Sequence, residues 1–303
     1  MTGVLPLDKA AGVTSFDAVA LVRRRLGQKR VGHAGTLDPD ATGVLPMLLG
    51  EATKLMAYLA DQDKEYVATL RLGVTTATGD LAGRILDERA VEPLDLPRVE
   101  EACRPFVGRI KQVPPMYSAV HHGGRRLYEL AREGIEVERE PREVVIHALE
   151  VQEVAGTRVR LRVVCGKGTY LRSLAVDLGA SLGCGAAVER LVRTRVGPFA
   201  LADALPWEAL AGEPAAALAA RVRPPETALS DWPAIRLDAR AEARFTHGQA
   251  VDIAPAGAAP GALVRVHGGG DRLLGVGEVA PGGRTRPVRV LHADRPGTRL
   301  LPA

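Results

Sequence analysis

Apolar side chains recur at every second position in several short stretches of this 303-residue chain, a pattern that predicts β-strands. In residues 65–72 the alternating face begins with Tyr66 and continues with aliphatic residues. Residues 158–165 alternate in the same way, and three arginines occupy the opposite face. Further strands are predicted over residues 3–9 and 144–154. We therefore expect a sheet with an apolar face, one strand of which carries a strongly basic strip on its other side.

Apolar residues at helical spacing predict helices over residues 15–26 and 51–60, the first of them capped by Ser15. A further helix is expected after residue 168. Its buried stripe consists of Leu171, Leu174, Ala175 and Leu178. Arg172 lies off this stripe, in the first turn, where the helix dipole disfavours a cation by ~0.3–1 kcal/mol. A nearby carboxylate is therefore expected to compensate.

The composition changes between residues 202 and 233, which are rich in alanine and proline, and we interpret this segment as a domain junction. Beyond it, glycine clusters separate three short alternating stretches at residues 262–266, 273–279 and 288–291. Short strands with such turns predict a small β-barrel. The chain is thus divided into a large domain over residues 1–230 and a small one over residues 231–303.

The charge and composition exclude some classes of protein. The net charge is +4 and the pI is about 9.1, which is compatible with nucleic-acid binding without establishing it. Hydrophobic residues make up 46% of the chain, which is enough for packed cores and unlike a disordered protein. No apolar run approaches ~18 residues, and the N-terminus lacks a signal-peptide pattern. We expect a soluble, cytoplasmic protein that has no membrane association.

Neither a cofactor nor a metal is predicted. The three cysteines, Cys103, Cys165 and Cys184, have no paired spacing, which argues against a disulfide framework and against a zinc site. A Gly-Lys-Gly turn at residues 166–168 lacks the glycine that a phosphate-binding P-loop needs five residues before its Gly-Lys pair, where Leu161 stands.

The strongest candidate for a catalytic segment is the glycine-rich stretch over residues 32–45. Three glycines and an Asp-Pro step predict a tightly folded loop. Pro39 pushes the preceding Asp38 towards an extended backbone, so that its carboxylate is held in one orientation. The loop leads straight into an apolar run, which is typical of a rigid scaffold that presents a reactive group. From spacing alone, a plain turn remains the alternative.

Residues 32–43, Gly-His-Ala-Gly-Thr-Leu-Asp-Pro-Asp-Ala-Thr-Gly, resemble the catalytic motif of the pseudouridine synthases that modify uridine 55 in the T loop of transfer RNA. This resemblance implies that Asp38 is the catalytic nucleophile. It also implies an α+β fold, in which a mixed, mainly antiparallel sheet is flanked by helices and followed by a small PUA-like C-terminal β-barrel that binds RNA.

Two other segments are similar to motifs of the same family. Lys64-Glu65-Tyr66, followed by Thr78-Gly79-Asp80, implies that Tyr66 stacks on the target uracil and is a candidate for proton transfer. The alternation by itself favours a core tyrosine at this position. The stretch from Cys165 to Arg172 resembles the motif whose arginine pairs with the catalytic aspartate, and this pairing is expected to lower the pKa of Asp38.

The resemblance also implies a set of substrate-binding residues. Tyr170 would pack beside the pocket and support Tyr66. His33 would occupy the space that flipped nucleotides leave. Leu191 would line the uridine pocket, although an ordinary core leucine explains this residue equally well. Lys9, where the resemblance begins, is expected to bind substrate too.

Residues 109–142 are similar to the mobile RNA-clamping insertion of the stand-alone bacterial enzymes. Pro114 and Pro115 predict an extended, exposed segment, and a basic run follows it. His121 stands where the family usually has lysine. Since histidine is only partly charged at neutral pH, this difference weakens an inferred phosphate contact.

Together these features predict an isomerase that flips uridine 55 out of the T-stem-loop of tRNA and converts it to pseudouridine without a cofactor. We expect a monomer without an obligatory protein partner. One alternative is the archaeal and eukaryotic relative that works with a guide RNA, and another is a non-catalytic RNA-binding or tRNA-folding protein. A glycoside hydrolase using Asp38 and Asp40 is disfavoured, because Pro39 between them makes it doubtful that they face each other across a sugar at ~5–9.5 Å.

Overall fold

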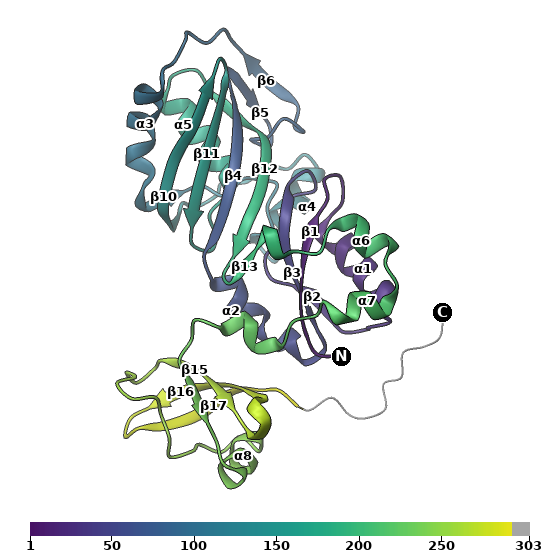
Figure 1. Ribbon diagram of the computed structural model, residues 1–303. Helices are drawn as coiled ribbons and strands as arrows, with labels where there is room; N and C mark the ends of the chain where they lie inside the picture. The colour runs from purple at the N-terminus through teal and green to yellow at the C-terminus, as the bar shows by residue number, and fades with distance from the viewer. Residues whose placement is uncertain (293–303) are drawn as a thin grey trace.

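A computed structural model describes residues 1–292 and contains a large mixed sheet and a smaller C-terminal sheet (Figure 1). In the described chain the large sheet has nine strands in the order β1-β3-β12-β4-β11-β10-β7, with β2 paired to β3 and β13 to β12. These strands are β1 (Gly3–Lys9), β2 (Val31–His33), β3 (Thr42–Leu49), β4 (Lys64–Leu72), β7 (Gly108–Gln112), β10 (Arg142–Ala155), β11 (Arg158–Cys165), β12 (Ala186–Val196) and β13 (Phe199–Ala200). The sheet is mainly antiparallel, as expected, and β3 with β12 is its one described parallel pair.

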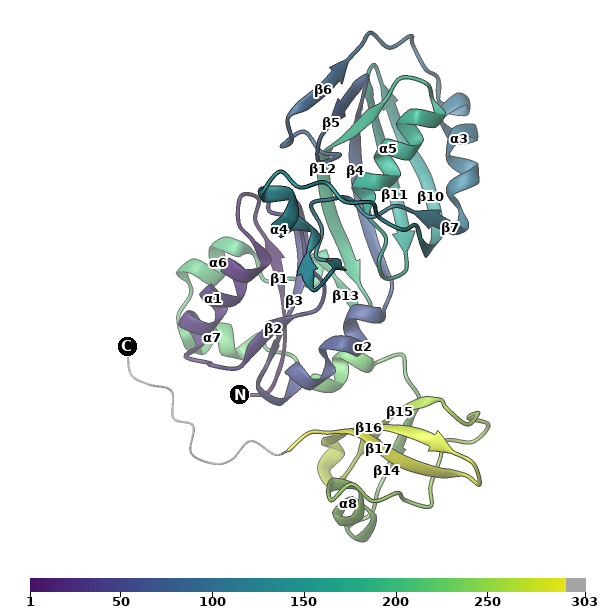
Figure 2. The ribbon, with the colours of Figure 1, turned by 180° about the vertical axis from the view of Figure 1, so that it is seen from behind.

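Helices cover the large sheet in two groups (Figure 2). The α-helices of residues 1–292 are α1 (Ser15–Leu26), α2 (Met56–Asp61), α3 (Leu96–Cys103), α4 (Leu127–Arg132), α5 (Leu171–Ser181), α6 (Trp207–Gly212), α7 (Ala215–Ala220) and α8 (Ala239–Thr246). Helices α3 and α5 lie on the half built from β4, β10, β11 and β12, whereas α1, α6 and α7 lie beside β1–β3. Within residues 1–292 no helix is both long and apolar enough to cross a lipid bilayer.

The N-cap of α1 lies one residue earlier in the sequence than the pattern indicates. Thr14, and not Ser15, is the N-cap, and it forms a capping box with Asp17. The Ser15 side chain is buried and bonds instead to the backbone of Leu37 in the glycine-rich loop. The expected N-cap residue thus ties the helix to the loop that precedes β3.

The parallel pairing of β3 with β12 brings two distant segments together at one glycine. Gly43 is paired with Arg193, and its φ of +107° is a conformation that only glycine adopts readily. A Cβ atom on Gly43 would lie 2.2 Å from the carbonyl oxygen of Arg193. On its other side β12 pairs with β4, where Arg193 is the partner of Tyr66. The end of the glycine-rich loop is therefore fixed beside the strand that carries Tyr66.

The interpretation of residues 202–233 as a junction needs correction. Most of this segment forms α6, α7 and two single turns of 3-10 helix, Leu201–Asp203 and Pro225–Leu229. Both α6 and α7 pack against α1, and the buried side chains of Leu210 and Leu218 belong to the core of the large sheet. Small alanine side chains allow this close helix packing, so the alanine-rich composition reflects a packed layer more than a linker.

The small C-terminal sheet is not the closed barrel that we expected. Its strands are β14 (Ala234–Arg236), β15 (Leu263–His267), β16 (Leu273–Ala280) and β17 (Arg284–Val290), paired in that order. In the described part of the chain, β14 and β17 do not pair with each other, so the sheet stays open. Helix α8 packs beside β17 (Figure 1). Alternating strands and glycine turns predict the strands but not whether the two edges meet.

An apolar cluster joins the small sheet to the large one. Leu273 and Leu291 share this buried cluster with Val44 of β3. The rings of Tyr58 and Trp232 meet edge to face, with centroids 5.3 Å apart. The C-terminal sheet is consequently connected to the large domain through an apolar cluster that includes a residue of the strand following the glycine-rich loop.

The basic strip predicted on β11 is largely neutralised. Arg158 pairs with Glu189 at 2.9 Å, and Arg162 lies 2.6 Å from Glu65. A second carboxylate, that of Glu150, lies 2.8 Å from Arg162. Two of the three arginines therefore hold cross-strand ion pairs, whereas Arg160 donates to the Gln152 side chain at 3.1 Å.

The close approach at Gly43 gives a prediction for stability. A Gly43→Ala variant should lose about 2–5 kcal/mol of unfolding free energy, because backbone strain and a clash with Arg193 add together. Gly156→Ala is the matched control, since Gly156 also has a positive φ but has no atom within 4 Å of the added Cβ. It should lose only about 1–2 kcal/mol. Urea denaturation that gave equal losses for the two variants would contradict the close approach.

Candidate active site

The loop between β2 and β3 is held from both sides of Asp38. Ser15 Oγ accepts a hydrogen bond from the Leu37 N–H at 2.9 Å and lies 3.1 Å from the Leu37 carbonyl oxygen, to which it donates. On the other side, the Pro39 carbonyl accepts from the Lys9 Nζ at 2.8 Å and from the Gly12 N–H at 3.0 Å. The residues that flank Asp38 are therefore fixed by β1 and α1, and the position of its backbone is set before any substrate binds.

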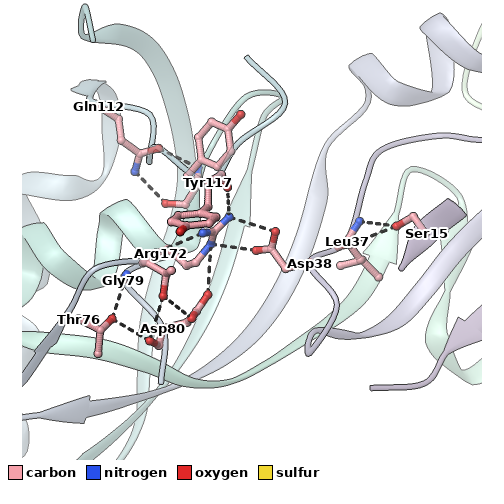
Figure 3. A network of polar contacts seen from close by, with 11 residues as sticks. Ser15, Leu37, Asp38, Thr76, Gly79, Asp80, Gln112, Tyr117 and Arg172 are labelled. Carbon is pink, nitrogen blue, oxygen red and sulfur yellow. Dashed lines mark hydrogen bonds and ion pairs between the residues drawn. The ribbon is translucent and has the colours of Figure 1, made fainter. Parts of the chain in front are cut away.

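Asp38 and Arg172 form a two-point ion pair (Figure 3). Arg172 Nε lies 2.9 Å from Asp38 Oδ2, and a terminal guanidinium nitrogen lies 3.0 Å from Oδ1. The Arg172 side chain is only 6% exposed, whereas that of Asp38 is 40% exposed. Such paired contacts fix the plane of the carboxylate as well as its distance. The expected pairing across 134 positions of sequence is thus present in the fold.

The guanidinium of Arg172 has further partners around it. It donates to the carbonyl oxygens of Thr78 at 3.2 Å and Tyr117 at 2.7 Å. The Asp80 carboxylate lies 3.7 Å from its Nε atom. Figure 3 shows Asp38, Asp80 and Tyr117 converging on Arg172 from separate parts of the chain. A nearby carboxylate was expected to offset the unfavourable position of Arg172 in the first turn of α5. Two aspartates, Asp38 and Asp80, supply this negative charge.

Arg172 is buried, although the helical pattern placed it off the buried stripe of α5. The wall of the cleft covers it, including the Tyr117 segment that lies outside the large sheet. Tyr170, the N-cap of α5, is fixed by a reciprocal pair of bonds between its backbone and the Gln112 side chain, at 2.7 Å and 3.0 Å. The spacing of apolar residues in a helix predicts only which face packs on the core. It could not predict that a loop would bury Arg172 on another face of α5.

The pKa of Asp38 is raised, contrary to our expectation that Arg172 would lower it. Loss of bulk water around the carboxylate is the largest effect and raises the pKa, and the charge of Asp80 acts in the same direction. Arg172 opposes both effects by its charge and its hydrogen bond. The side chain still meets the cleft with part of its surface, so a partly desolvated carboxylate is presented to any ligand there.

Two cavities open beside the ion pair, and Asp38, Arg172 and Leu191 line both of them. The wider one has a volume of about 780 Å³ and includes His33 and Asp38 in its lining. The narrower one measures about 260 Å³ and also reaches Asp38. Tyr66, Tyr170, Leu191 and Arg172 line this narrower cavity. With Asp38, five residues expected at the site are therefore brought together around one small volume.

Tyr66 has a core face, as the alternation predicts, and also a cavity face. It is 9% exposed and belongs to the core of the large sheet, and its ring also lines the narrower cavity. Burial raises the pKa of its phenol, and the charge of Arg193 opposes this rise. The phenol is therefore protonated at neutral pH and can donate a proton. Leu191 is likewise 9% exposed and lines both cavities, so it too has a core face and a cavity face.

Lys9 does not present its ammonium group to the cavity. The side chain is fully buried, and Nζ donates to the carbonyls of Ala10, Val13 and Pro39 at 2.7–2.8 Å. Burial lowers its pKa to about 8, although the charges of Asp40 and Asp38 act in the opposite direction. The substrate contact expected for Lys9 is thus replaced by a contact with the loop itself.

His33 lies at the wall of the wider cavity and is half-buried. Burial lowers its pKa, and the nearby charge of Arg193 lowers it further. The imidazole is therefore neutral at pH 7. A neutral, flat ring beside the ion pair can pack against bases without adding charge to the cleft.

The sequence pattern missed Arg193, which is 1% exposed. Its Nε atom donates to the Val44 carbonyl at 2.8 Å, and a terminal nitrogen donates to the Gly35 carbonyl at 3.1 Å. It therefore holds both arms of the glycine-rich loop and lies beside Tyr66. Alternation along an arginine-rich strand gives no signal that one arginine is buried. No role was predicted for Asp80 either, although it lies in the Thr78-Gly79-Asp80 segment that resembles a family motif.

No group of side chains suited to a metal ion occurs within residues 1–292. Cys103, Cys165 and Cys184 are buried free thiols, as their spacing predicts. Burial raises the pKa of Cys103 and Cys165 to about 11, so both are protonated and unreactive at neutral pH.

Comparison with known proteins identifies the family. The tRNA pseudouridine synthase B of Burkholderia mallei (strain NCTC 10247) is 47% identical over 286 residues, which span 93% of this chain and 94% of that protein. The sequence model of the TruB family pseudouridylate synthase N-terminal domain matches residues 23–171. The chain belongs to the TruB family of pseudouridine synthases. Models of TruB C-terminal domains match residues 172–230 and 233–291.

Other members and a solved structure agree with this assignment. The tRNA pseudouridine synthase B of Pseudomonas putida (strain F1) is 45% identical across 97% of both chains. A solved H/ACA ribonucleoprotein bound to a substrate RNA containing 2′-deoxyuridine contains a chain of the same fold. That chain is 27% identical with a TM-score of 0.72, covering 96% of this chain and 85% of its own. The TruB fold assignment therefore rests on sequence and on structure.

The charges around Asp38 predict two opposite shifts of its pKa. Replacing Arg172 with glutamine should raise the Asp38 pKa further, because an adjacent positive charge is lost. Asp80→Asn should lower it, because a repelling carboxylate is lost. NMR titration of ¹³C-labelled aspartate carboxyls measures both, with Asp38→Asn used to assign the signal. Shifts in the same direction for the two variants would contradict the arrangement.

Proposed function

We propose that this protein converts uridine 55 in the T loop of tRNA to pseudouridine. The observation that carries the proposal is the Asp38–Arg172 ion pair, whose two residues line both cavities. Membership of the TruB family and the relatives named tRNA pseudouridine synthase B support the reaction and the class of RNA. The position within tRNA rests on the motif in residues 32–43.

The reaction breaks the bond between N1 of uracil and C1′ of ribose and forms one between C5 and C1′. The base turns within the pocket in between, a proton leaves C5, and N1 gains a proton, so no redox step occurs. Asp38 is the group that attacks, or that stabilises positive charge at C1′ while the base is detached. A partly desolvated carboxylate suits this role, because a bound base would displace the water that still reaches it.

The narrower cavity is the proposed uracil site. Tyr66 would stack on the base, and its protonated hydroxyl would exchange protons at the base or the ribose. Tyr170 and Leu191 supply the other walls. His33, in the wider cavity, would fill the space that the everted nucleotide leaves in the RNA. In this account Lys9 is a positioning residue that holds Pro39, and it does not touch RNA.

The insertion at residues 109–142 supports action without a guide RNA. It contains its own small apolar cluster, formed around Met116, Leu127 and Leu130. An arginine-rich turn, β8 (His121–His122) to β9 (Arg125–Arg126), projects from this cluster. We infer a monomeric, cytoplasmic enzyme in which this segment grips the RNA backbone and needs no partner protein. The higher identity to the bacterial relatives than to the H/ACA protein favours the same assignment.

Tritium release from tRNA transcribed with [5-³H]uridine tests the proposal, because loss of the C5 proton accompanies the isomerisation. Wild-type protein alone should release about one equivalent of tritium per tRNA. Sequencing of the product should then find pseudouridine at position 55. Absence of release with purified protein would refute the enzymatic proposal, and release at another uridine would refute the target.

Asp38→Asn should reduce the rate by roughly 10³-fold or more, because the acting carboxylate is removed. The affinity for tRNA should change by no more than about threefold, since phosphate contacts supply most of it. Asp40→Asn is the matched control, because Asp40 is an exposed carboxylate of the same loop. The rate of Asp40→Asn should stay within about tenfold of the wild-type rate. Pseudouridine formation by the Asp38 variant would assign the reaction to another residue.

Tyr66→Phe should keep tRNA affinity but lower the single-turnover rate by about 10²-fold, because the ring remains while the hydroxyl is lost. Tyr66→Leu should weaken binding as well, because stacking is lost too. Filter binding and single-turnover kinetics separate the two effects. A wild-type rate for Tyr66→Phe would eliminate proton transfer by this residue and leave only stacking.

A further inference from the structure

Phe16 is the most exposed large hydrophobic residue in the described chain, at 70%, and it lines the wider cavity. It belongs to none of the apolar clusters formed within residues 1–292. We propose that Phe16 is a stacking platform for a second base of the substrate RNA, one that neighbours the target uridine in sequence. This inference rests on the proposed function and extends its substrate contacts.

The backbone of Phe16 is fixed relative to Asp38. Phe16 follows Ser15, whose side chain bonds both the N–H and the carbonyl of Leu37, the residue before Asp38. Thr14 and Asp17 form the capping box around the same turn of α1. The aromatic ring therefore projects from one of the most firmly held points near the ion pair. A contact made there loses little conformational entropy on binding.

The surroundings of Phe16 suit a base of single-stranded RNA. Leu81, which is 41% exposed, adds a second apolar side chain to the lining of the same cavity. Arg126 and Arg190 also line it and can meet the flanking phosphates or stack on a base. The same cavity contains Asp38, so RNA that places a uridine at Asp38 passes through this volume. Aromatic side chains recognise unstacked bases in this way, largely irrespective of their identity.

The affinity of variants at Phe16 tests the contact. Phe16→Ala should raise the Kd for a synthetic T-arm stem-loop RNA by about 5- to 150-fold, the range expected for loss of one base–aromatic stack. Because ground state and transition state share the contact, KM should rise similarly while kcat changes little. Phe16→Trp should bind within about threefold of wild type, and Phe16→Leu should resemble Phe16→Ala.

Leu96→Ala is the matched control, because Leu96 is a 43% exposed apolar residue in the first turn of another capped helix and lines neither cavity. It should leave Kd unchanged. Unchanged thermal melting of all the variants would exclude a folding effect. A wild-type Kd for Phe16→Ala would overturn the stacking inference.

T-arm RNAs that each lack one base identify the base that stacks on Phe16. Wild type and Phe16→Ala are compared on T-arm RNAs with an abasic nucleotide at each loop position except the target. At one position beside the target, the penalty of Phe16→Ala should vanish, because the base that stacks is already absent. A penalty that persists on every abasic RNA would mean that Phe16 acts through protein contacts, which overturns the inference. Tritium release by wild type on the intact RNA reports the proposed function separately.

Discussion

The buried guanidinium of Arg172 constrains the whole active-site region. A buried charge without acceptors costs about 3–5 kcal/mol, so the groups around it cannot move away independently. Its acceptors come from the glycine-rich loop at Asp38, from the Thr78–Asp80 turn and from the carbonyl of Tyr117 in the insertion. Three loops and helix α5 are consequently joined at one side chain. The geometry of the cleft depends on this junction more than on the core of any single element.

The same junction sets the chemistry of Asp38. Burial and Asp80 raise the pKa of its carboxyl, and Arg172 lowers it. A carboxylate in bulk water would be ionised but well solvated. The surrounding water could also hydrolyse an intermediate in which the base is detached from the ribose. A fully buried one without Arg172 would be neutral. The observed balance gives a carboxylate that meets the cavity on one side and its counterion on the other. Buried cations at Lys9 and Arg193 hold the loop through carbonyl oxygens, so they fix its shape without sharing the Asp38 carboxylate.

Much of the fold could be predicted because alternation is a local signal. The strand predicted over residues 158–165 is β11 to the residue. The loop predicted over residues 32–45 is shorter than expected, because Gly32 lies in β2 and Gly43 in β3. Burial that depends on distant segments could not be predicted. The insertion buries the side chain of Arg172, and the glycine-rich loop buries that of Arg193. The turn that follows Lys9 buries its side chain. The open edge of the C-terminal sheet and the packing of α6 and α7 on α1 also depend on contacts far apart in sequence.

A crystal structure of the protein with a T-arm RNA that carries 5-fluorouridine at the target position tests the central claim most directly. The account predicts that the fluorinated base lies in the narrower cavity against Tyr66, with the Asp38 carboxylate in van der Waals or covalent contact with the nucleotide. It also predicts that Arg172 still pairs with Asp38. A target nucleotide bound elsewhere, or an Arg172 that has left Asp38 to bind a phosphate, would contradict it.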